Sequence, residues 1–147
     1  MRADHVAVLV EEIESAVETW GLPIDGTIEE FPREGTRELY CGPHGASFRL
    51  LLMQPIGPGP YERAMAKRGA GLHHVAFCVP DLSKYVNDVQ SSGWLMHPAS
   101  LRLYDTHRQV WLCRPGVPTL IELNERTAKY DGAFIEGLWL SVSPTLS

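Results

Sequence analysis

An internal repeat dominates this sequence. The chain reads HVAVLVEEIESAV from His5 and HVAFCVPDLSKYV from His74. Each copy contains a short apolar run typical of a strand, then an acidic or proline breaker, then apolar residues at helical spacing. Gly21 and Gly93 are predicted to stop the two helices. Because the same strand–helix pattern occurs twice, the sequence predicts a duplicated structural unit.

Three further strand-like segments follow each predicted helix. PIGPGP and a predicted helix, YERAMAKR, separate the two copies. We therefore predict an α+β fold in which two βαβββ modules form one curved mixed sheet, an incomplete barrel, with the helices outside. The additional strands are expected at about residues 25–31, 35–41 and 47–54 in the first copy, and 95–103, 107–113 and 118–124 in the second.

The repeat also predicts how the chain is organised. We expect one domain over residues 1–125, made of module one (3–56), a linker helix (57–70) and module two (71–125). We expect residues 126–147 to form a C-terminal extension. Its segment AFIEGLWL is strongly apolar, so we expect it to cover the domain or a partner subunit.

Composition narrows the class of protein. The chain is 44% hydrophobic and 21% charged, with a formal net charge of −5. These values are ordinary for a globular protein and argue against non-specific nucleic-acid binding, which needs clustered Lys and Arg. The three cysteines lack CxxC spacing, which favours a reducing compartment. No signal peptide or membrane span is predicted. We therefore expect a cytoplasmic protein without a membrane partner.

The adjacent residues His73 and His74 raise the question of which one is functional. Successive side chains of a strand point to opposite faces, so the two cannot face one cavity. The repeat aligns His74 with His5, which favours His74 as a binding residue. A histidine at the start of a strand is usually structural, but two at equivalent positions are less easily explained in that way. We expect His73 to point outward, and its replacement by alanine to leave metal binding intact.

A carboxylate interrupts the apolar run TLIELNE. An ionised Glu122 within a sheet is costly unless it is paired or bound to a cation. One interpretation is a divalent metal held by His5, His74 and Glu122, since two imidazoles and one carboxylate form a common donor set. The alternative is an ion pair with an arginine such as Arg108 or Arg49.

The doubled module, the two HVA strand starts, GLHHVAF and LIEL resemble the vicinal oxygen chelate superfamily. Over residues 3–125 the chain is most similar to its methylmalonyl-CoA epimerase and glyoxalase I-like branch. The resemblance implies a divalent metal ion (Co, Mn, Ni or Zn) held by His5, His74 and Glu122. It also implies a small carbonyl or acyl-thioester substrate, and it is compatible with a homodimer.

Two further positions come from the resemblance. The epimerase branch carries Gln or Glu in the last strand of module one, where this chain has Leu51, which cannot coordinate a metal. Gln54 lies nearby but is expected on the other face. Glu38 stands where the branch carries a proposed acid/base, with Glu122 or a water opposite it. The alternative for Glu38 is a solvated glutamate beside Arg37.

Three functions therefore remain open. The leading one is a metal-dependent lyase or isomerase that acts through an enolate, with Glu38 and Glu122 as catalytic residues. The second is an iron(II) extradiol-type dioxygenase with a two-His, one-Glu triad. The third is a non-catalytic protein of the same fold that binds a small molecule. Outside the candidate site, Arg63 and Lys67 are expected on a solvated helix face, His44 in a turn, His97 in a structural role, and His107 at the start of a strand near the site.

Overall fold

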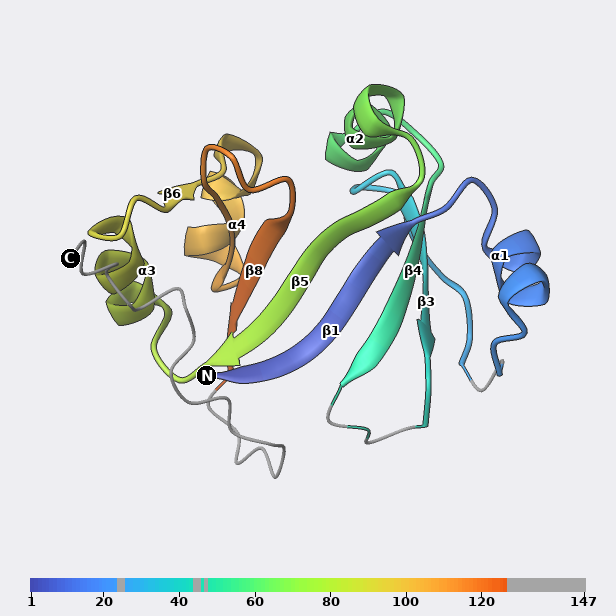
Figure 1. Cartoon of the computed structure of the whole chain (residues 1–147), viewed down its shortest axis with the longest axis horizontal. Helices are drawn as coiled ribbons and strands as arrows, with labels where there is room; N and C mark the ends of the chain where they lie inside the picture. The colour runs from blue at the N-terminus through green and yellow to red at the C-terminus, as the bar shows by residue number, and fades with distance from the viewer. Residues whose placement is uncertain (24–25, 44–45, 47, 127–147) are drawn as a thin grey trace. The chain divides into compact units, whose positions relative to one another are not determined.

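The computed structural model describes residues 1–23, 26–43, 46 and 48–126. The predictions for His44 and for the extension beyond Arg126 therefore lie outside the described residues. The elements, which can be followed in Figure 1, are β1 (Arg2–Leu9), α1 (Ile13–Trp20), β2 (Glu29–Phe31), β3 (Thr36–Cys41), β4 (Arg49–Pro55), α2 (Pro60–Arg68), β5 (Gly71–Val79), α3 (Leu82–Gln90), β6 (Leu95–Met96), the 3-10 helix η1 (Pro98–Ser100), α4 (Leu101–Thr106), β7 (Gln109–Cys113) and β8 (Leu120–Glu125).

The predicted fold class is confirmed. The strands form a mixed eight-stranded sheet in the order β2-β3-β4-β1-β5-β8-β7-β6, so β2 and β6 are its two ends and the sheet is not closed. The chain divides into two compact units, one of His5–His74 and the other of Met1–Asp4 with the chain from Val75 onward.

In the His5–His74 unit, α1 covers one face of the strands. Its apolar side chains pack against β3 and β4, and the buried cluster consists of Val10, Ile13, Ala16, Val17, Leu39, Cys41 and Leu52. Gly21 ends α1 with φ of 63°, a left-handed conformation that glycine adopts without a steric penalty. β1 runs parallel to β4 and pairs Ala7 with Leu51. The face that α1 leaves uncovered carries His5, Ala7 and Leu9, because side chains alternate along the strand.

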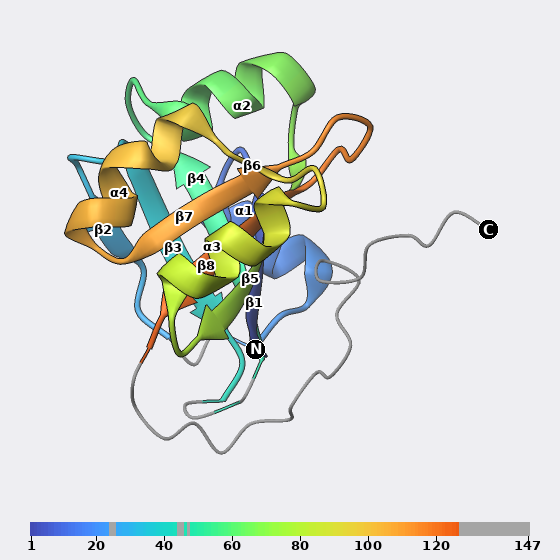
Figure 2. The ribbon, with the colours of Figure 1, turned by 90° about the vertical axis from the view of Figure 1, so that its left-hand side faces the viewer.

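In the second unit, α3 packs on the strands in the corresponding way, and α4 lies beside β7 (Figure 2). Asp81 caps α3 by accepting a hydrogen bond from the backbone N–H of Lys84 at 3.0 Å, as a helix start of this kind requires. The buried cluster is Met1, Phe77, Val79, Leu82, Val86, Val89, Trp94, Val110, Leu112, Ile121 and Leu123.

The structure corrects the predicted strand at 95–103. Only Leu95–Met96 is a strand; η1 and α4 follow it. Pro98 cannot donate to a strand ladder, and the Nδ1 atom of His97 accepts the N–H of Ala99 at 3.2 Å, which starts η1. His97 is therefore structural, as predicted. His107 is exposed at the C-terminal end of α4 rather than at the start of a strand.

The end of α3 also differs from the prediction. This helix ends at Gln90 with Ser91 as its C-cap, and Gly93, at φ of 83°, lies in the turn that follows. None of the helices in the described part of the chain combines the length and apolar character that a membrane span requires.

Candidate metal centre

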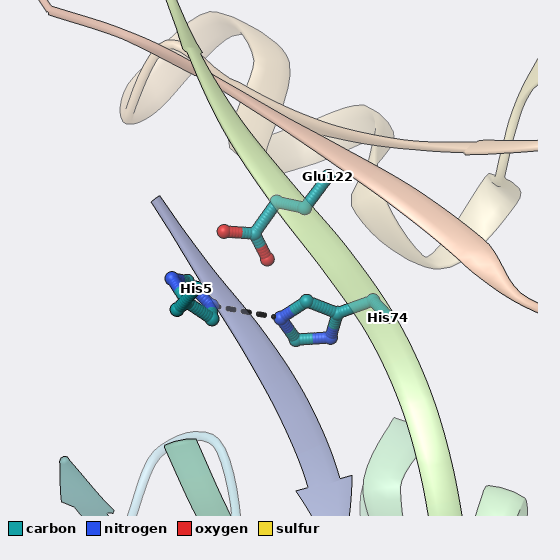
Figure 3. Close-up of side chains that lie close together, drawn as sticks. All are labelled: His5, His74 and Glu122. Carbon is teal, nitrogen blue, oxygen red and sulfur yellow. Dashed lines mark hydrogen bonds between the residues drawn. The ribbon is translucent and has the colours of Figure 1, made fainter. Parts of the chain in front are cut away.

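His5 and His74 come together as the repeat predicts. Their Nε2 atoms lie 3.0 Å apart, in the contact that the dashed line in Figure 3 marks. The two rings meet edge to face, and the residues are only 3% and 1% exposed. Two buried imidazoles with converging Nε2 atoms form a suitable pair of ligands for a transition metal.

β4, which pairs with β1, carries Leu51 at the position where the resemblance implies a fourth metal ligand. Ala7 shares the His5 face of β1, and its partner across the parallel ladder is Leu51. Directly paired residues on neighbouring strands point to the same face, so Leu51 lies on the side of His5 and is buried. This position therefore contributes an apolar side chain where the resemblance implies an oxygen donor.

Gln54 does not replace that donor. Its Oε1 atom accepts hydrogen bonds from the N–H of Ile13 at 3.2 Å and from Nη1 of Arg37 at 3.0 Å. Gln54 thus anchors the start of α1, on the face opposite Leu51. This arrangement agrees with the expectation that Gln54 lies away from the ligand face.

The prediction that His73 points outward is wrong. His73 is 2% exposed, and its ring packs against Tyr61 of α2 with the ring centroids 5.3 Å apart. Its Nδ1 atom lies 2.8 Å from Nδ1 of His74. Strand alternation separates the Cβ atoms of neighbours, but Nδ1 is close to the backbone in each ring, so these two atoms can still meet. The other side of the strand is covered by Tyr61, which the sequence pattern did not reveal.

Glu122 is held by two hydrogen-bond donors in its own unit. The indole Nε1–H of Trp111 donates to Oε2 at 2.7 Å, and Nδ2 of Asn124 donates to Oε1 at 2.7 Å. Glu122 is 4% exposed, and a carboxylate with N–H donors on both oxygens is compatible with burial.

Sequence reasoning missed both of these donors. Asn124 lies two residues after Glu122 and so faces the same side of β8, a signal that strand alternation already contains. Trp111 is the direct partner of Glu122 across the antiparallel β7–β8 pair, which only the strand register reveals.

The arginines named as alternative partners of Glu122 have other contacts. Nη2 of Arg108 lies 2.8 Å from Oε2 of Glu125, and its Nη2 also donates to Ser83. The guanidinium of Arg49 stacks on the ring of Tyr40, 4.0 Å from its centroid. The observed contacts thus engage Arg108 with Glu125 and Arg49 with Tyr40.

Glu38 lines a cavity of about 150 Å³ in the His5–His74 unit, together with Tyr40, Arg49 and neighbouring residues of β2 and β3. Tyr40 lies two residues after Glu38 on the same face of β3, and its ring contacts the His5 ring edge to face, with centroids 5.5 Å apart. Neighbouring strands are about 4.8 Å apart, so β3 lies roughly 10 Å from β1. Glu38 shares the His5 face, and through Met53 of β4 it lies level with Leu9, four residues further along β1 than His5.

Arg37, the residue named beside Glu38 in the alternative interpretation, forms ion pairs with Glu14 and Glu30. Nη2 of Arg37 lies 2.6 Å from Oε1 of Glu14, and Nε lies 3.6 Å from Oε1 of Glu30. Arg37 and Glu38 are neighbours in β3 and point to opposite faces. The Arg37 side chain therefore lies on the α1 side of the strands, where it meets Glu14, and Glu38 lies on the other side. Arg63 and Lys67 are exposed on α2, in agreement with a solvated helix face.

Cys78 is an unreactive buried thiol. Burial, and then the negative charge of Asp4, raise the pKa of Cys78 to about 12. Its Sγ atom donates to Oδ1 of Asp4 at 3.4 Å. Since the thiolate is the reactive form, this residue does not supply a nucleophile at neutral pH.

Comparison with known proteins places this geometry in a family. The model described as Glyoxalase/Bleomycin resistance protein/Dioxygenase superfamily matches residues 4–111. No curated protein matches the sequence. A solved structure of a hypothetical protein from Bacillus halodurans C-125 is 22% identical with a TM-score of 0.66, over 87% of this chain and 96% of that chain.

Several similar structures are methylmalonyl-CoA epimerases. One in complex with methylmalonyl-CoA and NH4+ is 24% identical with a TM-score of 0.64, over 90% of this chain and 98% of that chain. The enzyme from Mycobacterium tuberculosis is 23% identical with a TM-score of 0.62, over 86% and 89% of the two chains. At these identities the likeness shows the fold. Together with the family model, it confirms the resemblance seen in the repeat: the chain belongs to the glyoxalase/bleomycin resistance protein/dioxygenase superfamily, the vicinal oxygen chelate proteins.

Proposed function

We propose that this protein is a metal-dependent lyase or isomerase of the glyoxalase or methylmalonyl-CoA epimerase type. It would act through an enolate on a small carbonyl or acyl-thioester substrate. The observation that carries the proposal is the buried His5–His74 pair, with Nε2 atoms 3.0 Å apart. The fold neighbours that include epimerases solved with methylmalonyl-CoA support the choice of substrate class.

The metal ligands in this proposal are His5, His74 and Glu122 (Figure 3). All three are buried, and each offers one donor atom of the kind that a metal ion binds. Imidazole and carboxylate donors suit Co, Mn, Ni or Zn. A bound divalent ion would supply a Lewis acid that stabilises the negative charge of an enolate oxygen.

Glu38 is the proposed base. Its carboxylate would take the proton from the carbon next to the substrate carbonyl, and the electrons of that C–H bond would become the enolate. A protonated Glu122, or a water, would return a proton to the opposite face of that carbon, and Glu38 would release the proton that it took to solvent, which completes an isomerisation. Tyr40 and Arg49 line the cavity beside Glu38 and would orient the substrate between this base and His5.

A dioxygenase is the second candidate, because Leu51 is buried on the His5 face. Without a donor at that position, the proposed ligand set is two His and one carboxylate, which is also the facial triad of non-haem iron oxygenases. Metal analysis of protein purified without added metal distinguishes the candidates. Near-stoichiometric Co, Mn, Ni or Zn supports the enolate reaction, iron supports the oxygenase, and no metal supports a non-catalytic binding protein.

The His74→Ala variant tests the metal site directly. We expect it to lose stoichiometric metal, because one of three ligands is removed. The matched control is His107→Leu, which changes an exposed histidine on α4 and should keep the metal. Retention of full metal content by a folded His74→Ala variant would show that the ion is held elsewhere.

Exchange of the α-hydrogen in D₂O tests the reaction. Methylmalonyl-CoA is incubated with the metal-loaded protein, and loss of its α-proton signal is followed by NMR. Glu38→Gln should slow exchange by about 10²–10⁴-fold, as expected for loss of a general base, with metal content unchanged. Glu30→Gln, an exposed glutamate of β2, is the control. Metal-dependent exchange that is undiminished in Glu38→Gln would remove Glu38 from the mechanism.

A further inference from the structure

The contact between His73 and His74 constrains where protons can be. Their Nδ1 atoms lie 2.8 Å apart, a distance at which one nitrogen must carry a proton and the other must offer a lone pair. The same requirement applies to the Nε2 atoms of His5 and His74 at 3.0 Å. A neutral imidazole carries a single ring proton, so a neutral His74 donates in one of these contacts and accepts in the other.

This constraint leaves two arrangements of the three rings. In the first, Nδ1–H of His74 donates to His73, and the Nε2 lone pair of His74 accepts the Nε2–H of His5, a proton that His5 would release to solvent on binding a metal. In the second, His73 donates to His74, and Nε2 of His74 carries the proton. Only the first arrangement presents a lone pair at the atom that faces His5, and a metal ligand must bind through a lone pair.

We propose that His73 is a positioning residue for His74: its Nδ1 accepts the Nδ1–H of His74 and thereby fixes the tautomer whose Nε2 lone pair points toward His5. This inference rests on the proposed function for its metal, but the tautomer itself is a property of the chain alone. The ring of His73 is fixed by burial and by its packing on Tyr61. His73 then carries its own proton on Nε2.

The expected effect on metal binding follows from this geometry. Metal-bound histidines usually donate their other N–H to an acceptor, and loss of that acceptor typically lowers metal affinity by about 10–100-fold. In this chain the acceptor is a second, buried histidine that precedes the ligand directly. Replacing His73 would leave the Nδ1–H of His74 without this acceptor. The Nδ1–H tautomer of His74 would then no longer be favoured over the Nε2–H tautomer.

The experiment combines NMR of the metal-free protein with zinc titration. At a pH of about 8, the ¹⁵N shifts of both His74 ring nitrogens identify the protonated one. We expect Nδ1–H in the wild type. His73→Leu should lower zinc affinity by about 10–100-fold, whereas His73→Asn should restore most of it, because its Oδ1 replaces Nδ1 as the acceptor. His107→Leu should have no effect.

The outcomes separate this inference from the proposed function. A wild type whose His74 is mainly protonated on Nε2 would overturn the inference, and so would a folded His73→Leu variant with wild-type zinc affinity. If His73→Leu fails to fold, the wild-type tautomer and His73→Asn still decide the question. A wild type that binds no divalent metal would instead refute the proposed function, while the tautomer measurement would still test the role of His73.

Discussion

Replacing Leu51 with glutamine tests whether the missing donor limits metal binding. Leu51 is 3% exposed, and its ladder partner Ala7 shares the face of His5. A glutamine at this position has a similar volume and would direct its amide oxygen to the same face as the His5 imidazole. We expect tighter binding of a divalent metal, because an oxygen donor is added where the chain now has a methyl-bearing side chain.

The magnitudes follow from burial. Loss of a buried leucine side chain costs about 1.5–3 kcal/mol, and a buried amide without a partner costs about 1–3 kcal/mol more. The metal-free variant should therefore lose about 2.5–6 kcal/mol of a total stability that is typically about 5–15 kcal/mol. In the metal-loaded variant the amide oxygen has a partner, so part of this cost is recovered on binding. Each recovered 1.4 kcal/mol corresponds to about a tenfold gain in affinity.

Two measurements check this reasoning. Denaturant unfolding with and without zinc gives the stability of each form, and a zinc titration gives the affinity. The matched control is Leu50→Gln, on the opposite face of β4, which should lose stability without a gain in affinity. A folded Leu51→Gln variant whose zinc affinity equals that of the wild type would refute the argument and would indicate that another group already fills the position.

Three further predictions concern the second unit. Trp111→Phe removes the indole N–H that donates to Oε2 of Glu122, and since a hydrogen bond to a charged group contributes about 1.5–3 kcal/mol, denaturant unfolding should show at least that loss; unchanged stability would contradict it. The Arg108 guanidinium, and then the backbone N–H of Leu82, lower the pKa of Glu125 from 4.5 to about 2, so its ionised form stabilises the fold above pH 4.5 and this stabilisation is lost as pH falls toward 2. Glu125→Gln should make stability less dependent on pH across that range, and an unchanged pH profile would argue against the pair. Cys78 should resist a thiol reagent at about pH 8 in the folded protein and react after unfolding, as measured by mass spectrometry.

The sequence predicted the parts of this molecule that depend on local periodicity. The duplicated strand and helix patterns predicted the mixed sheet and its helices, and the repeat register together with strand alternation paired His74 with His5, whose Nε2 atoms lie 3.0 Å apart. The same alternation explains why Gln54 is directed away from Leu51. These results depend only on which face each residue occupies, and a single strand determines that.

Other features depend on contacts between distant segments and were not predictable in this way. The burial of His73 depends on Tyr61, which comes from α2 and packs on the His73 ring. The partner of Glu122 depends on the register between β7 and β8. The strand predicted over 95–103 ends early for a local reason, because Pro98 cannot donate to a strand ladder and His97 caps η1.

The pairing of Trp111 with Glu122 limits how this protein can be altered. Side chains in a ladder alternate, so a slip of one residue between β7 and β8 would turn Glu122 to the other face of the sheet. The register between β7 and β8 can therefore change only by whole residues. Only a shift by an even number of residues keeps the Glu122 carboxylate on the same face of the sheet. A redesigned turn around Gly116 must therefore keep Trp111 and Glu122 on the same face of the β7–β8 pair.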